Sequence, residues 1–133
     1  MIDKVNGSIS FDHENVVLKP NMSIDSFKKT SLYHGGNFEP NYPLKDIKSI
    51  GNKEFHITVY FNNDKLKEVH LYEANEKNSW GEWSEESELK TKKNHDDWLM
   101  SILGSPPYEY PWGQVGSVFD RKALISSIMV IFN

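Results

Sequence analysis

A regular alternation of side chains over residues 54–73 constrains the fold of this chain more than any other feature. A period of two is typical of a β-strand that has one face in the core and the other toward solvent. In the first half of the segment the apolar positions are Phe55, Ile57, Val59 and Phe61, which alternate with His56, Thr58 and Tyr60. We therefore expect two antiparallel strands joined by a turn.

The turn formers Asn62, Asn63 and Asp64 stand between these two strands. A turn at all three residues sets the pairs Phe61 with Lys65, Ile57 with Val69, and Phe55 with Leu71. In this register most apolar side chains of the two strands share one face. A slip by one residue would move Glu68 onto the core face, so the apolar pattern favours the first register.

Shorter segments on either side predict further elements. Ser23 is a good N-cap, and Met22 and Phe27 have the spacing of a hydrophobic staple, so we expect a short helix over residues 24–32. The remaining strands are predicted as a hairpin within 8–18, a strand at 44–50, and a final hairpin at 114–119 and 124–132. The spacing within 44–50 fits a helical turn as well.

The final predicted strand, 124–132, is apolar on both faces toward its end. Such a strand belongs inside a sheet that is covered on both sides. By contrast, residues 34–43 contain the turn formers of a surface loop. The aromatic stretch 108–112 is also expected to be a loop.

A second, longer helix is predicted to begin after Ser84, a good N-cap followed by two glutamates that suit the positive end of the helix dipole. Gly104, ahead of two prolines, is expected to end it. The residues between Leu89 and Trp98 are polar throughout, so a start at the alternative N-cap Asn94 also fits the pattern. The expected buried stripe is Leu89, Trp98, Leu99, Ile102 and Leu103.

The element order β-β-α-β-β-β-α-β-β lacks the strand and helix alternation of doubly wound folds. We therefore expect an α+β fold in which two helices pack on one face of a mainly antiparallel sheet. A length of 133 residues suits a single domain.

Composition argues against several classes of function. The net charge of −4 disfavours a nucleic-acid binder, because such proteins neutralise phosphates with clustered Lys and Arg. The chain has no cysteine, which rules out disulfides, thiolate zinc sites and cysteine nucleophiles. We expect a soluble cytoplasmic protein, because no signal-peptide pattern and no long apolar run is present. Common catalytic motifs are also missing, and no cofactor is indicated.

The predicted hairpin register suggests one candidate for metal binding or acid–base chemistry. It places His56 opposite His70 and Thr58 opposite Glu68 on the outer face of the sheet. Two imidazoles and a carboxylate can hold zinc or transfer protons. A metal-dependent hydrolase using His56, His70 and Glu68 is therefore one possible function. The alternative is an ordinary solvent-facing surface, which is polar without being functional.

His95, Asp96 and Asp97 follow one another on the second predicted helix. Consecutive helical residues point about 100° apart, so these three side chains cannot easily converge on one ion. His95 shares a helix face with Leu99 and Ile102. We expect it to be packed or half-buried rather than to act as a ligand.

Aromatic and acidic side chains concentrate between residues 73 and 112. All four tryptophans lie there, at positions 80, 83, 98 and 112, together with Tyr108 and Tyr110. Residues 73–88 also hold six glutamates and one lysine. Exposed aromatic residues anchor protein interfaces, and acidic patches attract basic partners. The alternative is that Trp98 is core and the other tryptophans seal the sheet under their loops.

Four short runs carry a resemblance that spans about half of the chain: 79–86 (SWGEWSEE), 95–99 (HDDWL), 116–120 (GSVFD) and 126–128 (SSI). They resemble small uncharacterised bacterial proteins, some of which are similar to immunity partners of secreted toxins. The resemblance implies a cytosolic protein that binds and blocks a cognate toxin, and it assigns a role to no residue.

The leading hypothesis from the sequence is therefore a protein-binding module, most concretely an immunity protein for a basic toxin domain. A structural or ligand-binding domain with a pocket lined by the tryptophans is a further alternative. The residues expected to bind the partner are Trp80, Glu82, Trp83, Glu85, Glu86, Tyr108, Tyr110 and Trp112.

Overall fold

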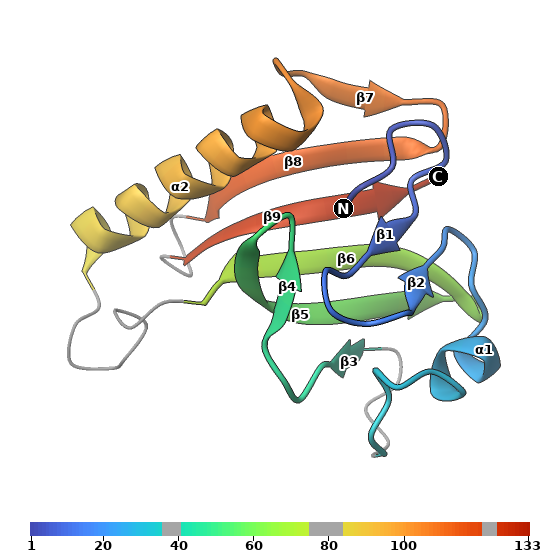
Figure 1. Cartoon of the computed structure of the whole chain (residues 1–133). Helices are drawn as coiled ribbons and strands as arrows, with labels where there is room; N and C mark the ends of the chain where they lie inside the picture. Colours follow the sequence, from blue (N-terminus) through green and yellow to red (C-terminus); the bar gives the residue numbers. More distant parts are fainter. Residues whose placement is uncertain (36–40, 75–83, 121–124) are drawn as a thin grey trace.

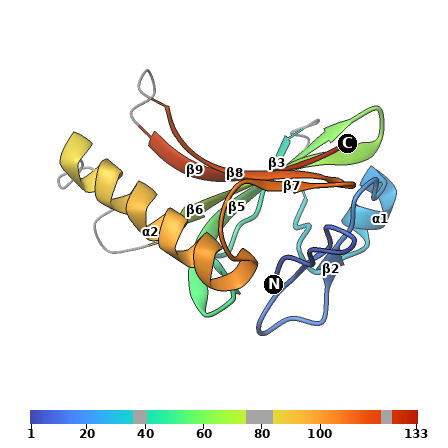
Figure 2. The ribbon, with the colours of Figure 1, turned by 90° about the horizontal axis from the view of Figure 1, so that it is seen from above.

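The computed structural model describes residues 1–35, 41–74, 84–120 and 125–133. The strands of its main sheet are β3 (Asn41–Pro43), β4 (Lys48–Ile50), β5 (Lys53–Asn62), β6 (Lys65–Glu73), β7 (Tyr108–Tyr110), β8 (Gly113–Asp120) and β9 (Ile125–Phe132). Within the described ranges these seven strands pair antiparallel in the order β3-β5-β6-β9-β8-β7, and β4 pairs with β5 (Figure 1). Both helices lie on the same side of the sheet (Figure 2), which confirms the predicted α+β fold.

The hairpin of β5 and β6 has the predicted core face but not the predicted register. Asn63 and Asp64 alone form the turn, with positive φ angles of 52° and 62° that Asn and Asp tolerate better than most residues. An irregularity further along the strands shifts the pairing once more, so Ile57 lies opposite Leu71 rather than Val69. This offset is even, and the buried and exposed faces are therefore the predicted ones.

β9 lies between β6 and β8 inside the sheet, as its apolar sequence predicts. Ile128, Val130 and Phe132 are fully buried on the core face. The expected cover on both sides is wrong for the described residues. Met129 and Ile131 on the opposite face are half-buried, and no described helix lies over them (Figure 2). In the register of the sheet, Met129 lies between His70 and Gly116, and Ile131 lies between Glu68 and Gln114.

The N-terminal segment forms a separate two-stranded sheet, β1 (Ile9–Ser10) and β2 (Val17–Leu18), followed by α1 (Ile24–Lys28). Ser23 caps α1 as predicted and accepts a hydrogen bond from the Ser26 N–H. The helix is shorter than predicted. The Thr30 hydroxyl donates to the Phe27 carbonyl, and such side-chain bonds compete with helix continuation. The Phe27 ring packs among Tyr33, Tyr42 and Phe61.

Asp12 ties the N-terminal segment to the turn between β4 and β5. Its carboxylate accepts hydrogen bonds from the Ser49 hydroxyl and from the N–H groups of Gly51 and Asn52. These bonds, the one from Ser49 first among them, lower the pKa of Asp12 from its ordinary value. The carboxylate of Asp12 thus stabilises a contact between segments distant in sequence.

Two short strands occupy segments that were expected to be loops. β3 pairs with β5, and β7 pairs with the first three residues of β8. Each is too short to show an alternating pattern, and Pro43 is compatible with β3 because proline is tolerated on edge strands. Of the predicted strand 44–50, only β4 is regular.

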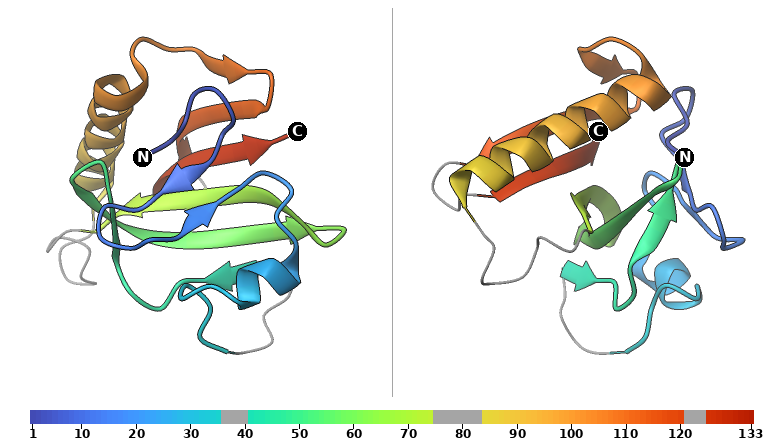
Figure 3. Two further views of the ribbon diagram at one scale, coloured as in Figure 1. Left: turned by 45° about the vertical axis from the view of Figure 1, so that its right-hand side comes forward. Right: turned by 60° about the vertical axis from the view of Figure 1, so that its left-hand side comes forward.

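α2 (Glu85–Leu103) begins after Ser84, as predicted, and not at the alternative Asn94. It ends at Gly104, whose φ of 85° suits glycine. The predicted burial of Leu89 is wrong, because this side chain is 49% exposed. Instead, the buried face of the first half of α2 is polar and consists of Glu88, Thr91 and His95. Figure 3 shows the helix lying across β8 and β9.

Candidate functional site

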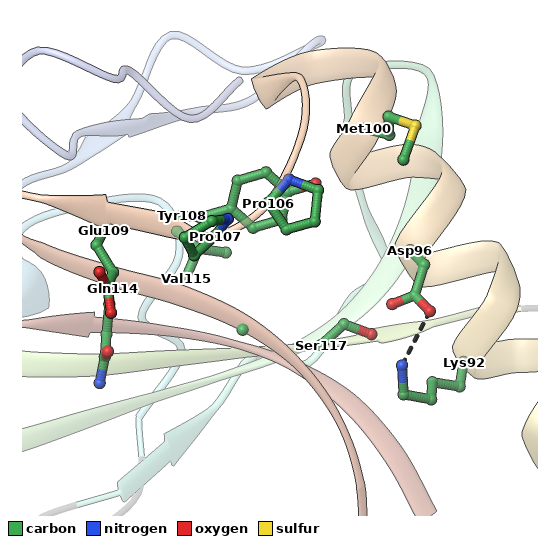
Figure 4. A pocket seen from close by; sticks show the side chains of 11 residues that line it. Lys92, Asp96, Met100, Pro106, Pro107, Tyr108, Glu109, Gln114, Val115 and Ser117 are labelled. Atoms are coloured by element: carbon green, nitrogen blue, oxygen red, sulfur yellow. Dashed lines mark hydrogen bonds and ion pairs between the residues drawn. The ribbon is translucent and has the colours of Figure 1, made fainter.

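An open groove of about 490 Å³ lies between α2 and the β7–β8 side of the sheet (Figure 4). Lys92, Asp96 and Met100 form its helical wall. The rest of the lining comes from β7, β8 and the two prolines before β7: Pro106, Pro107, Tyr108, Glu109, Gln114, Val115, Gly116 and Ser117. This mixture of apolar, charged and hydrogen-bonding side chains is the kind found at protein interfaces.

The helical wall is built from residues at intervals of three or four, which brings them to one side of α2. Met100 is 53% exposed, and Leu89, on the same side toward the start of the helix, is 49% exposed. Between them, the Lys92 ammonium lies 2.9 Å from the Asp96 carboxylate. We call Leu89, Lys92, Asp96 and Met100 the α2 stripe. It presents two apolar side chains on either side of an ion pair.

The Lys92–Asp96 pair faces Ser117 of β8 across the groove (Figure 4). Burial raises the pKa of Asp96, but the Ser117 hydroxyl and the Lys92 ammonium outweigh this effect, so that the pKa lies below its ordinary value. Asp96 is therefore ionised at neutral pH. The pair fills the part of the groove where the helix and the strand come together.

A buried polar cluster on the other side of α2 fixes the helix against the sheet. Glu88 is 2% exposed. Its carboxylate accepts hydrogen bonds from the Ser126 N–H at 2.8 Å and from the Tyr72 hydroxyl at 2.9 Å. The Glu88 backbone carbonyl accepts a third bond, from the Ser126 hydroxyl, at 2.8 Å. Burial and the Glu88 carboxylate raise the pKa of Tyr72, so its hydroxyl keeps the proton that it donates.

His95 belongs to the same buried side of α2 and is 0% exposed. Its Nε2 accepts a hydrogen bond of 3.0 Å from the Glu73 N–H, which places the proton of the neutral ring on Nδ1. Among the described residues this Nδ1 has no hydrogen-bond partner. Burial lowers the pKa of His95 to about 4, so the ring is neutral at physiological pH. The expectation that His95 packs against the core is confirmed.

The residues predicted to bind a partner do not form one cluster in the described part of the chain. Trp80, Glu82 and Trp83 lie outside the described residues. Glu85 and Glu86 are exposed in the first turn of α2. The remaining three, Tyr108, Tyr110 and Trp112, belong to β7 or to the turn that follows it.

Tyr108 lines the groove as a largely buried side chain, and its hydroxyl donates a hydrogen bond of 2.8 Å to the Gly104 carbonyl. Tyr110 and Trp112 stack, with ring centroids 5.0 Å apart, and both are half-buried. Trp112 Nε1 donates to the Lys4 carbonyl at 2.8 Å. Trp112 thus holds the N-terminal segment against the sheet.

The predicted metal or acid–base site does not form in the observed register. His56 lies opposite Tyr72, and Thr58 lies opposite His70. His70 Nε2 is 3.1 Å from a carboxylate oxygen of Glu68, which makes a pair and not a three-residue cluster with His56. Among the described residues, no group of three His, Asp or Glu side chains is placed to hold a metal ion.

Sequence interpretation missed most of the groove, including Lys92, Met100 and Ser117. The available signal was the i, i+4 spacing of Lys92 and Asp96, which is typical of an exposed helix side. In the second half of α2 the buried side was predicted correctly, since Trp98, Leu99 and Leu103 are buried. In the first half the buried side is polar, so the sequence did not show which side of the helix is exposed there.

Comparisons of this chain with protein-family models, with curated proteins and with solved structures found no match. Neither of the described helices combines the length and the apolar character needed to span a bilayer. What this chain does is therefore inferred from the residues of the groove.

Proposed function

We propose that this chain is a cytoplasmic protein-binding module, most concretely an immunity protein that neutralises a toxin through the groove between α2 and β8. The observation that carries the proposal is the exposure of Leu89 and Met100 on the α2 stripe. Apolar side chains of this size are usually buried. Met100 lines the groove, and Leu89 lies on the same side of α2 beyond the lining. An exposed apolar side chain in a groove with a polar rim is typical of an interface with another protein.

The rigidity of α2 supports this role. Glu88 joins the helix to β9 through two hydrogen bonds with Ser126, and His95 joins it to β6 through the Glu73 N–H. A surface that is already ordered loses less conformational entropy when it binds. At 1.5 Å per residue, Leu89 and Met100 are held about 16 Å apart along the helix axis. The two apolar contacts are thus presented at a fixed spacing.

The acidic balance of the whole chain favours a basic partner. Glu85 and Glu86 are exposed at the start of α2, and Glu109 is exposed on β7. The whole chain carries a net charge of −4. Acidic groups around an apolar contact accelerate association with a basic protein and disfavour acidic competitors. Toxins that act on nucleic acids present basic surfaces of this kind.

Co-production with the product of a neighbouring toxin gene tests the proposal. We expect a complex that survives gel filtration and protection of cells that contain the toxin. Met100→Lys should weaken the complex at least about tenfold, because a charge would be buried against the partner. Ser101→Lys is the matched control, since Ser101 is exposed on the same helical turn but does not line the groove.

The control should change affinity by less than about threefold, as expected for a charge outside the interface. Circular dichroism of both variants verifies that they are folded. If neither a complex nor protection is observed, the proposed function is wrong. Equal losses from the two lysine variants would show that the groove is not the binding surface.

A further inference from the structure

β7 covers only part of the strand edge that borders the groove. It pairs with residues 113–115 and ends, whereas β8 continues to Asp120. Among the described residues, no backbone hydrogen bond reaches residues 116–119 from that side. Figure 1 shows β7 beside one half of β8 and α2 beyond the other half. Gly116 and Ser117 belong both to this open edge and to the lining of the groove.

The register identifies the backbone groups on the open edge. The Trp112 carbonyl accepts a hydrogen bond from the Asn133 N–H, so the polar backbone groups of residue 112 face β9. In an antiparallel strand these groups alternate from one side to the other. β8 pairs with β9 along its full length without a register shift. The N–H and C=O groups of Ser117 and Phe119 therefore face the open edge.

We infer that this edge binds an extended segment of a partner protein as an additional strand in line with β7. The inference rests on the proposed function and specifies how the partner is held. A row of alternating backbone donors and acceptors is matched by another extended backbone. The open stretch, residues 116–119, is about 14 Å long at the rise of an antiparallel strand.

The surroundings of the edge specify the side chains of the bound segment. Alternate side chains of an added strand point toward the α2 stripe, where Leu89 and Met100 are exposed, and these are expected to be apolar. The others point to the opposite face of the sheet. Glu109 is exposed at the end of the open stretch that adjoins β7. Basic side chains in the segment therefore complement its rim.

Charge also distinguishes this partner from a second copy of the chain. Two copies would each bring a net charge of −4 to the interface, and edge-to-edge pairing would place like carboxylates near one another. An extended basic segment has the opposite charge. It forms the same backbone hydrogen bonds without that repulsion.

A blocked peptide of alternating lysine and valine, about seven residues long, is a probe that matches the open edge. Its matched control has glutamate in place of lysine. In NMR titrations we expect the lysine peptide to shift the amide signals of Ser117 and Phe119 and to slow their hydrogen exchange at least about tenfold. The glutamate peptide should bind at least about tenfold more weakly.

N-methylated forms of the lysine peptide test the backbone contact directly. Only every second peptide N–H of an added strand can face β8. Methylation of that set should abolish binding, whereas methylation of the alternate set should preserve it. This comparison uses the unaltered protein and does not depend on the folding of a variant.

Ser117→Pro is the corresponding change in the protein. It removes an N–H that faces the open edge and leaves the pairing of β8 with β9, since proline is tolerated at sheet edges. Ser117→Ala is the matched control, because it removes the hydroxyl and keeps the N–H. The proline variant should no longer bind the lysine peptide, whereas the alanine variant should still bind it.

Three results would overturn strand addition by a basic segment. The first is no binding of the lysine peptide at about 1 mM, or equal binding by its methylated forms. The second is a dimer of the free protein that Ser117→Pro dissociates, since a second copy would then occupy the edge. The third is a toxin complex that is lost in Met100→Lys and unchanged in Ser117→Pro. In this third case the proposed function stands without strand addition.

Discussion

Lowering the pH from 8 to 5 should reveal the burial of His95. In the folded chain burial lowers the pKa of His95 to about 4, compared with an ordinary value of 6.5. The unfolded chain therefore binds a proton at a higher pH than the folded chain does. The stability that the neutral ring contributes is complete above pH 6.5 and is lost as the pH falls toward 4.

The expected magnitude follows from the difference between the two pKa values. At about 1.4 kcal/mol per pKa unit, proton linkage lowers the free energy of unfolding by about 2 kcal/mol at pH 5 and about 3 kcal/mol below pH 4. Charged neighbours act in both directions, because Glu73 and Asp96 favour the protonated ring while Lys53 and Lys92 disfavour it. Burial outweighs them.

Urea denaturation at pH 8 and at pH 5 measures this effect. His95→Gln keeps an acceptor for the Glu73 N–H and does not titrate, so its free energy of unfolding should fall by about 2 kcal/mol less than that of the wild type. The same replacement at exposed His34 is the matched control for the loss of one imidazole and should retain the wild-type response. Equal losses in the wild type and His95→Gln, or an NMR titration of His95 with a midpoint near 6.5, would refute the reasoning.

Three further predictions concern the packing, and urea denaturation measures each of them. Glu88→Ala should lower the free energy of unfolding by about 3 kcal/mol, because the Ser126 N–H loses its acceptor. Glu88→Gln keeps an acceptor oxygen and should lower the free energy of unfolding by only about 1 kcal/mol. Equal losses of stability in the two variants would contradict this role of Glu88. Gly113→Ala should prevent normal pairing of β8 with β9, since a Cβ would lie 2.0 Å from the Ile131 carbonyl oxygen, whereas Gly116→Ala, whose nearest such contact is 3.9 Å, should remain folded. Asp12→Ala should cost about 1 to 2 kcal/mol at pH 7, and the cost should diminish as acid protonates Asp12 in the wild type; a cost that does not change with pH would argue against the ionised carboxylate as the cause.

The sequence was informative where burial follows a regular period. Alternation predicted the β5–β6 hairpin and its core face, and the apolar run of β9 predicted its place inside the sheet. The register was wrong because it depends on the number of turn residues and on a local irregularity, and neither leaves a periodic signal. Asn62, expected in the turn, instead pairs with Lys65. The sequence therefore could not show which polar residues of β5 lie opposite which polar residues of β6.

The candidate groove could not be predicted from the sequence for a different reason. Glu88 and His95 are buried because Ser126, Tyr72 and Glu73 supply hydrogen bonds from distant parts of the chain. A polar residue with such partners can occupy a core position, but the helical pattern alone shows only its polarity. Leu89 was therefore wrongly predicted to be buried, whereas Trp98, Leu99 and Leu103 are buried as predicted. The open edge of β8 was also hidden, because it depends on where the short strand β7 ends.

The place of β9 in the sheet has a consequence for synthesis on the ribosome. β9 follows every other described strand along the chain, yet it joins β6 to β8. The two parts of the sheet therefore cannot unite until β9 has been translated and has left the exit tunnel. The bond from Trp112 to Lys4, 108 residues apart, also forms late. Contacts between residues so distant in sequence make folding slow for a chain of this size. Until β9 pairs with it, β6 has an unpaired edge in the nascent β5–β6 hairpin, and chaperones can protect that edge from aggregation.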